Sequence, residues 1–244
     1  MKKYDYIEKG AGEVILLLHG LMGAVSNFES TLNELPKHGY RVILPMLPLY
    51  ELPLIKTNVN ELTKFINNFL KDLGITKCSI LGNSLGGHIG LLLALKDPDK
   101  INKLILSGSS GLYENTLGGK FPKRGDYDYI KQKTEEVFFD PQKASKKLVD
   151  EIFEIVNSRE KVIRVLMMAK SAIRHNMKDD LKNIKHKTCI IWGRNDKVTP
   201  PEVGEEFHKN IDNSELFWMD NCGHAPMIEK PTEFNNILIK WLKE

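Results

Sequence analysis

Short apolar runs recur along the chain and alternate with segments of helical period. Six runs have the length and composition of buried strands: 14–18, 41–44, 77–81, 103–107, 188–192 and 214–219. Between them, 58–73 places its apolar side chains on one helical face, and 231–242 opens with proline and glutamate. Strands that are apolar throughout are buried on both faces. The chain is therefore predicted to be α/β, with a mostly parallel sheet, helices on both faces and an antiparallel edge strand at 4–9.

The alternation breaks between 111 and 187, where no strand-like run occurs. Helix-start signals at Asp140-Pro141 and at 157–160 predict two helices, ending near Val156 and Arg174. A crossover between parallel strands needs only about a dozen residues. We therefore interpret the stretch as an inserted helical cap, although a set of ordinary crossover helices fits the same pattern. The resulting division is a core of 1–110 and 188–244 and a cap of 111–187.

Composition limits the classes of function. The 244 residues carry a net charge of only +3, with lysines and acids intermixed, which argues against nucleic acid as a partner. Cys78, Cys189 and Cys222 are too far apart in sequence to suggest a disulfide framework or a metal site. The apolar runs are too short to span a membrane, and no secretory signal follows Met1. We expect a cytoplasmic, reduced protein without metal or cofactor, and the oligomeric state stays open.

One strand-to-helix junction is rich in glycine around a single serine. Gly82-Asn83-Ser84-Leu85-Gly86 fits the pattern G-x-S-x-G, with an apolar run before it and a helical run after it. In such a turn, small residues two positions either side of the serine avoid clashes with the neighbouring strand and helix. The turn then leaves the hydroxyl exposed at the edge of the sheet. Ser84 is thus the candidate nucleophile.

A serine hydroxyl needs a base to take its proton and an acid to orient that base. Asp196 follows the run 188–192, and His224 lies on a glycine-containing loop after 214–219. Alone, either residue would more often be an ordinary loop residue. The order nucleophile, acid, histidine, each after a predicted strand, points to a triad of Ser84, Asp196 and His224. Asp220 is the rival for the acid.

Backbone N–H groups near the serine would hold a developing oxyanion. We assign this role to the N–H groups of Leu85 and Leu21, with Met22 as the alternative to Leu21. His19 lies in the loop that carries Leu21 and is expected to orient that loop rather than move protons. The helix position of His88 predicts that its side chain either points away from the nucleophile or packs.

Four motifs, HGLMG, GNSLGG, IIWGRNDKVTP and NCGHAPMIEKP, resemble those of the α/β-hydrolase superfamily. The resemblance spans the chain outside 111–187. It implies a sheet of roughly eight strands and the triad already described. Within the superfamily, the sequence is most similar to small bacterial esterases and to the carbon–carbon bond hydrolases of aromatic-ring degradation.

Two departures from the carbon–carbon hydrolases favour an esterase. Those enzymes usually carry tryptophan after the histidine, where this chain has Ala225, and an arginine in the cap that is absent from the matching stretch 150–153. The loop 44–54 also departs from the superfamily, and it either lines an apolar pocket or packs in the core. We expect a serine hydrolase that acts on a small to medium, mainly apolar acyl substrate. A carbon–carbon hydrolase of vinylogous diketones and a ligand sensor of low turnover are the alternatives.

Overall fold

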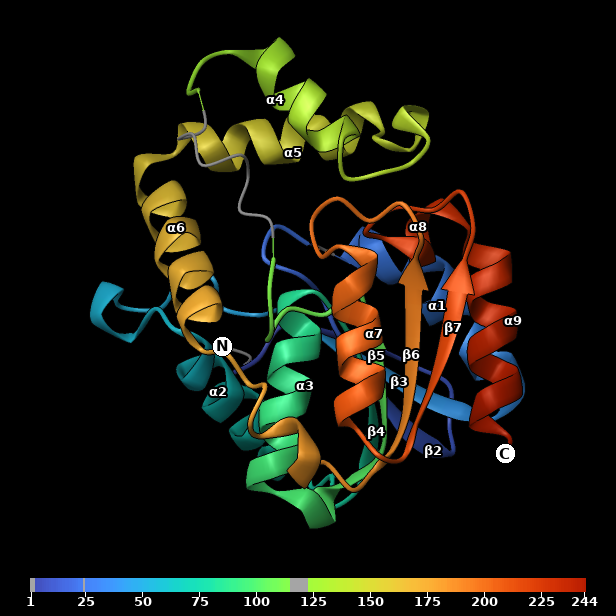
Figure 1. Ribbon diagram of the computed structural model, residues 1–244. Coiled ribbons are helices and arrows are strands. Elements are labelled where there is room, and N and C mark those ends of the chain that lie inside the picture. The colour runs from blue at the N-terminus through green and yellow to red at the C-terminus, as the bar shows by residue number, and fades with distance from the viewer. Residues whose placement is uncertain (1–2, 24, 115–122) are drawn as a thin grey trace.

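The computed structural model describes residues 3–23, 25–114 and 123–244 (Figure 1). Its described residues form one seven-stranded sheet with the order β1-β3-β2-β4-β5-β6-β7. The strands are β1 (Tyr6–Lys9), β2 (Glu13–Leu18), β3 (Tyr40–Pro45), β4 (Cys78–Asn83), β5 (Ile101–Ser107), β6 (Lys187–Gly193) and β7 (Ser214–Met219). β1 pairs antiparallel with β3, and every other pairing is parallel. The predicted α/β fold is confirmed, with one strand fewer than the roughly eight that the resemblance implied.

Alternate side chains of the central strands enter two separate cores. On β2, Leu16 and Leu18 join one apolar cluster, and Ile15 and Leu17 join the other. Successive side chains of a strand point to opposite faces, so a strand that is apolar at every position must be covered on both sides. This explains why the strand runs of the sequence are continuous rather than alternating.

Helices cover both faces of the sheet (Figure 1). The first cluster holds buried residues of α2 (Val59–Asp72), α3 (Leu85–Lys96) and α7 (Pro201–Asn210). The second holds those of α1 (Glu29–Glu34), α8 (Pro226–Glu229) and α9 (Pro231–Leu242). No helix in the described ranges is long and apolar enough to cross a bilayer.

In the described part of the stretch between β5 and β6 lie three α-helices: α4 (Tyr127–Glu135), α5 (Lys146–Asn157) and α6 (Arg159–Arg174). We call them the inserted helices. Figure 1 shows α4 and α5 beyond the carboxyl ends of the strands. α6 begins after Ser158, whose hydroxyl accepts a hydrogen bond from Lys161 N–H.

The prediction that a helix starts at Asp140-Pro141 was wrong in its boundary. Asp140 does accept a hydrogen bond from Gln142 N–H, but it caps only a short 3-10 helix, Pro141–Lys143. α5 starts later, after Ser145, whose hydroxyl accepts from Leu148 N–H. Two successive caps compete here, and the second lies next to the amphipathic run.

The loop after β3 packs in the core. Leu47 and Leu49 are buried in the first cluster, whereas Leu54 is exposed. The loop 44–54 was expected either to line an apolar pocket or to pack in the core. Its first half, with the buried leucines, packs in the core.

Candidate active site

Ser84 lies at a strained turn between β4 and α3. Its φ of 53° and ψ of −120° fall in a region that residues other than glycine seldom adopt. At the two flanking glycines there is no room for a side chain. A Cβ on Gly86 would lie 2.0 Å from the Leu18 carbonyl oxygen, and one on Gly82 would lie 2.4 Å from the Gly86 backbone. The G-x-S-x-G pattern thus allows a sharp turn that presents the serine at the sheet edge.

The loop after β2 lies against the same turn. A Cβ on Gly20 would come within 3.3 Å of Ser84 Cβ. Buried His19 holds the loop, since Nδ1–H donates to the Gly20 carbonyl (2.9 Å) and Nε2 accepts from Leu47 N–H (3.1 Å). Burial lowers the pKa of His19, which keeps the imidazole neutral. These contacts match the expectation that His19 orients the loop.

The candidate oxyanion donors flank Ser84. Leu85 is the first residue of α3, so its N–H has no carbonyl one turn earlier to bond. Leu21 follows Gly20 in the turn that the Gly23 N–H···O=C Gly20 hydrogen bond closes at 3.1 Å. The free N–H groups and the dipole of the α3 N-terminus suit a negative oxygen.

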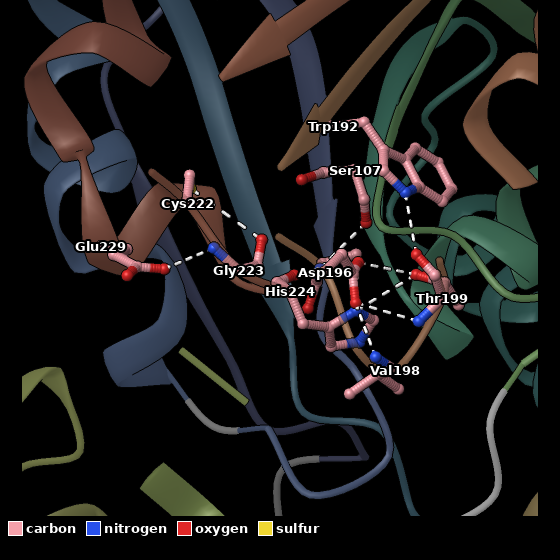
Figure 2. Close-up of polar contacts among 10 residues, drawn as sticks. Ser107, Trp192, Asp196, Val198, Thr199, Cys222, Gly223, His224 and Glu229 are labelled. Atoms are coloured by element: carbon pink, nitrogen blue, oxygen red, sulfur yellow. Dashed lines mark hydrogen bonds and ion pairs between the residues drawn. The ribbon is translucent and has the colours of Figure 1, made fainter. Parts of the chain in front are cut away.

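Asp196 and His224 form a buried pair, as the close-up in Figure 2 shows. They come from the loops after β6 and β7, and His224 Nδ1 lies 2.8 Å from Asp196 Oδ2. A carboxylate only accepts hydrogen bonds, so Nδ1 carries the proton and Nε2 is left as the base. This pairing is the one that the sequence predicted.

Thr199 was not anticipated from the sequence. Its hydroxyl donates to Asp196 Oδ2 (2.8 Å) and lies 3.2 Å from His224 Nδ1. The N–H groups of Val198 and Thr199 donate to Asp196 Oδ1 at 2.8 and 2.9 Å. Four donors in all point at this carboxylate, which suits its ionised form. Aspartate followed by threonine three residues later is a local turn pattern that could have revealed the contact.

Asn83 ties the histidine loop to the serine turn. Its side-chain amide donates to the carbonyls of Ser107 (2.9 Å) and His224 (3.2 Å), and Ser84 N–H donates to the same Ser107 carbonyl (3.1 Å). Gly108, with φ of 50°, lets the chain pass close by, because a Cβ there would lie 3.0 Å from His224 Nδ1. The three predicted triad residues thus share one edge of the sheet. No hydrogen bond joins Ser84 to His224 in the described residues, and such contacts often tighten only around substrate.

Opposing effects set the charge of His224. Burial favours the neutral imidazole, but the charge and hydrogen bond of Asp196, helped by the Glu114 carboxylate, outweigh it and raise the pKa of His224 above its ordinary value. Glu114 is itself partly withdrawn from water, and burial raises its pKa. The site therefore gathers negative charge around one histidine.

The rival residues lie elsewhere. Asp220 is exposed and pairs with Arg194 (2.8 Å). His88 is buried in α3, where burial and His175 lower its pKa to about 3. Its Nε2 lies 3.1 Å from Nδ1 of His175, which is half-buried. This contact joins α3 to the residue that caps the C-terminus of α6.

The cysteines are free and buried. Burial raises the pKa of Cys78 and of Cys222 to about 12, so neither is a thiolate nucleophile at neutral pH. Within the described ranges, no three histidine, cysteine or acidic side chains gather as metal ligands.

Known proteins match nearly the whole chain. A family model described as the alpha/beta hydrolase fold matches residues 13–231. The 2-hydroxy-6-oxo-6-phenylhexa-2,4-dienoate hydrolase of Comamonas testosteroni is 27% identical over 261 residues, which cover 98% of this chain and 91% of that protein.

Solved structures agree on the fold. MGS-MChE2, an alpha/beta hydrolase enzyme from the metagenome of sediments from the lagoon of Mar Chica, Morocco, is 42% identical with a TM-score of 0.82, covering 100% of this chain and 96% of that one. The esterase EaEST of Exiguobacterium antarcticum is 23% identical with a TM-score of 0.85, covering 99% and 96%.

Proposed function

Because the chain belongs to the α/β-hydrolase family, we propose that it is a serine hydrolase of small to medium, uncharged acyl compounds. The observation that carries the proposal is the strained turn at Ser84 beside the buried His224–Asp196 pair. The relatives that match this chain are named as hydrolases, which favours an enzyme over a ligand sensor. A cytoplasmic location stays a prediction.

In the proposed reaction, Ser84 Oγ attacks the substrate carbonyl carbon while His224 Nε2 takes the hydroxyl proton. The carbonyl oxygen becomes an oxyanion that the N–H groups of Leu21 and Leu85 hold. When the carbonyl reforms, the leaving alkoxide departs with the proton from His224, and an acyl group remains on Ser84. Water then attacks this ester, His224 accepts its proton and returns it to Ser84, and the acid is released. Asp196 keeps the imidazole in the required tautomer throughout.

Charge near the site supports the preference for uncharged substrates. Glu114 interacts with His224, so a substrate carboxylate close to the scissile bond would meet a like charge. Arg164, on an inserted helix, donates to the backbone carbonyls of Leu52 and Glu160. None of the described hydrogen bonds or ion pairs brings an arginine to the triad. A cap role for 111–187, closing over this edge, is part of the same proposal.

Carbon–carbon bond hydrolysis is the second candidate, and the name of the Comamonas relative favours it. The same triad edge could serve both reactions, since each needs an activated nucleophile and an oxyanion site. The two candidates differ in the charge that the substrate carries beside the reacting carbonyl. The site thus predicts a preference that can be measured.

The test compares p-nitrophenyl esters of increasing acyl length with 2-hydroxy-6-oxo-6-phenylhexa-2,4-dienoate. We expect kcat/KM for p-nitrophenyl butyrate to exceed that for the dienoate. Glu114→Gln removes the like charge and should narrow the difference between the kcat/KM values for the ester and the dienoate. Glu151→Gln, on α5, is the matched control and should leave that difference unchanged. A dienoate kcat/KM well above that of the ester would promote the carbon–carbon hydrolase.

A further inference from the structure

Residues 137–140, between α4 and the 3-10 helix Pro141–Lys143, lie directly on the histidine loop. His224 N–H donates to the Val137 carbonyl at 2.9 Å. A Cβ on Gly223 would lie 2.5 Å from that carbonyl and 2.9 Å from Phe138 Cα, so only glycine permits the approach. Residues 137–140, which we call the inserted segment, therefore pack directly against the loop that carries the candidate base.

A buried carboxylate joins the same two segments a second time. Glu229, at the end of α8, is only 4% exposed. Its Oε2 accepts from Gly223 N–H and its Oε1 accepts from Asp140 N–H, both at 2.7 Å. Figure 2 shows the Glu229 side chain directed at Gly223, next to His224. One charged group thus bridges the histidine loop and the inserted segment.

We propose that Glu229 is a positioning residue, which sets the place of His224 by fastening its loop to residues 137–140. The inference deepens the proposed function, on which it rests. Both bonds to Glu229 are short and charge-assisted. Phe138 is also buried, in the same apolar cluster as Cys222 and Ala225, so apolar packing supports the junction as well. A shift of the inserted segment would move the base that serves Ser84.

Glutamine is the sharpest substitution because it keeps the shape of the side chain. A carboxylate has two acceptor oxygens, but an amide has one oxygen and one NH₂ donor. In Glu229→Gln, either Gly223 N–H or Asp140 N–H must therefore face a donor while buried. Glu233→Gln is the control. Glu233 lies four residues further along, on α9, and its ion pair with Lys230 is a loose one of 3.6 Å.

The experiment measures ester hydrolysis at a temperature well below unfolding, together with the Nδ1–H proton resonance of His224 by NMR. For Glu229→Gln we expect kcat to fall about 10- to 100-fold with little change in KM, because a small misplacement of a catalytic group is costly. We also expect the resonance to shift or broaden as the contact with Asp196 loosens. Glu233→Gln should change kcat by less than about twofold. Glu229→Asp keeps the charge but cannot span both donors, and it provides a milder second variant.

The proposal is overturned if Glu229→Gln or Glu229→Asp lowers only the melting temperature while kcat and the His224 resonance stay as in the unchanged protein. That result would make Glu229 a support of the fold alone. Ester hydrolysis that survives in Ser84→Ala would instead defeat the proposed function. The NMR comparison needs no turnover, so the two failures can be told apart.

Discussion

The carboxyl edge of the sheet and the inserted helices are held in different ways. At the edge, Asn83, Asp196, Thr199 and His224 are buried and joined by side-chain hydrogen bonds across β4, β5, β6 and β7. The inserted helices present mostly half-exposed faces, with Ile173 of α6 open to solvent. Phe139, in the segment between α4 and α5, is exposed as well. A buried polar network fixes geometry closely, whereas partly exposed amphipathic helices tolerate change. We infer that the edge sets the chemistry and the inserted helices set the choice of substrate.

The largest expected effect is the loss of the nucleophile at the edge. Ser84→Ala should lower kcat for an ester by roughly 10⁴- to 10⁶-fold, since the remaining groups cannot form the acyl-enzyme. The melting temperature should change little, because alanine adopts the same strained turn and fills nearly the same space. Steady-state kinetics and thermal unfolding together check this. Retained turnover in a rigorously purified variant would contradict the assignment.

Exchange of the acid comes next. Asp196→Asn should lower kcat about 10⁴-fold, because an amide cannot hold the imidazole in the tautomer that leaves Nε2 free. Asp220→Asn is the matched control, since that carboxylate pairs with Arg194 at the surface. The assignment is reversed if Asp220→Asn is the crippling change and Asp196→Asn is mild.

The pH dependence of kcat/KM tests the Asp196–His224 pair without removing either residue. His224 must be neutral to accept the Ser84 proton, and its pKa is raised by Asp196 and Glu114 after burial has opposed them. As pH falls through that raised pKa, kcat/KM should decline tenfold per unit, with a midpoint above about 6.5, the ordinary value for histidine. Glu114→Gln should move the midpoint to lower pH. An unmoved midpoint would mean that Glu114 does not act on His224.

The smallest effect is expected in the inserted helices. Ser158→Ala removes the hydroxyl that caps α6, which should lower the free energy of unfolding by about 1 kcal/mol. Esterase kcat should stay within about threefold of the unchanged protein, because Ser158 is remote from the triad contacts. Denaturant unfolding and steady-state kinetics measure both. A loss of kcat as large as that of Asp196→Asn would erase the contrast between the two regions.

The difference between the sheet edge and the inserted helices also explains which features could be predicted from the sequence. Ser84, Asp196 and His224 could be placed because each follows an apolar strand, and parallel strands bring their carboxyl ends to one edge. The bridge made by Glu229 could not be predicted. Gly223 lies close to Glu229 in the sequence, but Asp140 lies 89 residues away, and only the folded chain brings it to the carboxylate. The start of α5 was misplaced because Asp140-Pro141 and Ser145 are both valid caps, and only packing chooses between them.

The account's central claim is that Ser84 is the nucleophile of an acyl-transfer site. It is tested most directly by mass spectrometry of the protein after reaction with a fluorophosphonate, with peptide mapping of the adduct. We expect one adduct per chain, located on Ser84, blocked by prior incubation with an ester substrate and absent from Ser84→Ala. An adduct that persists in Ser84→Ala, or that maps to another residue in the unchanged protein, would contradict the claim.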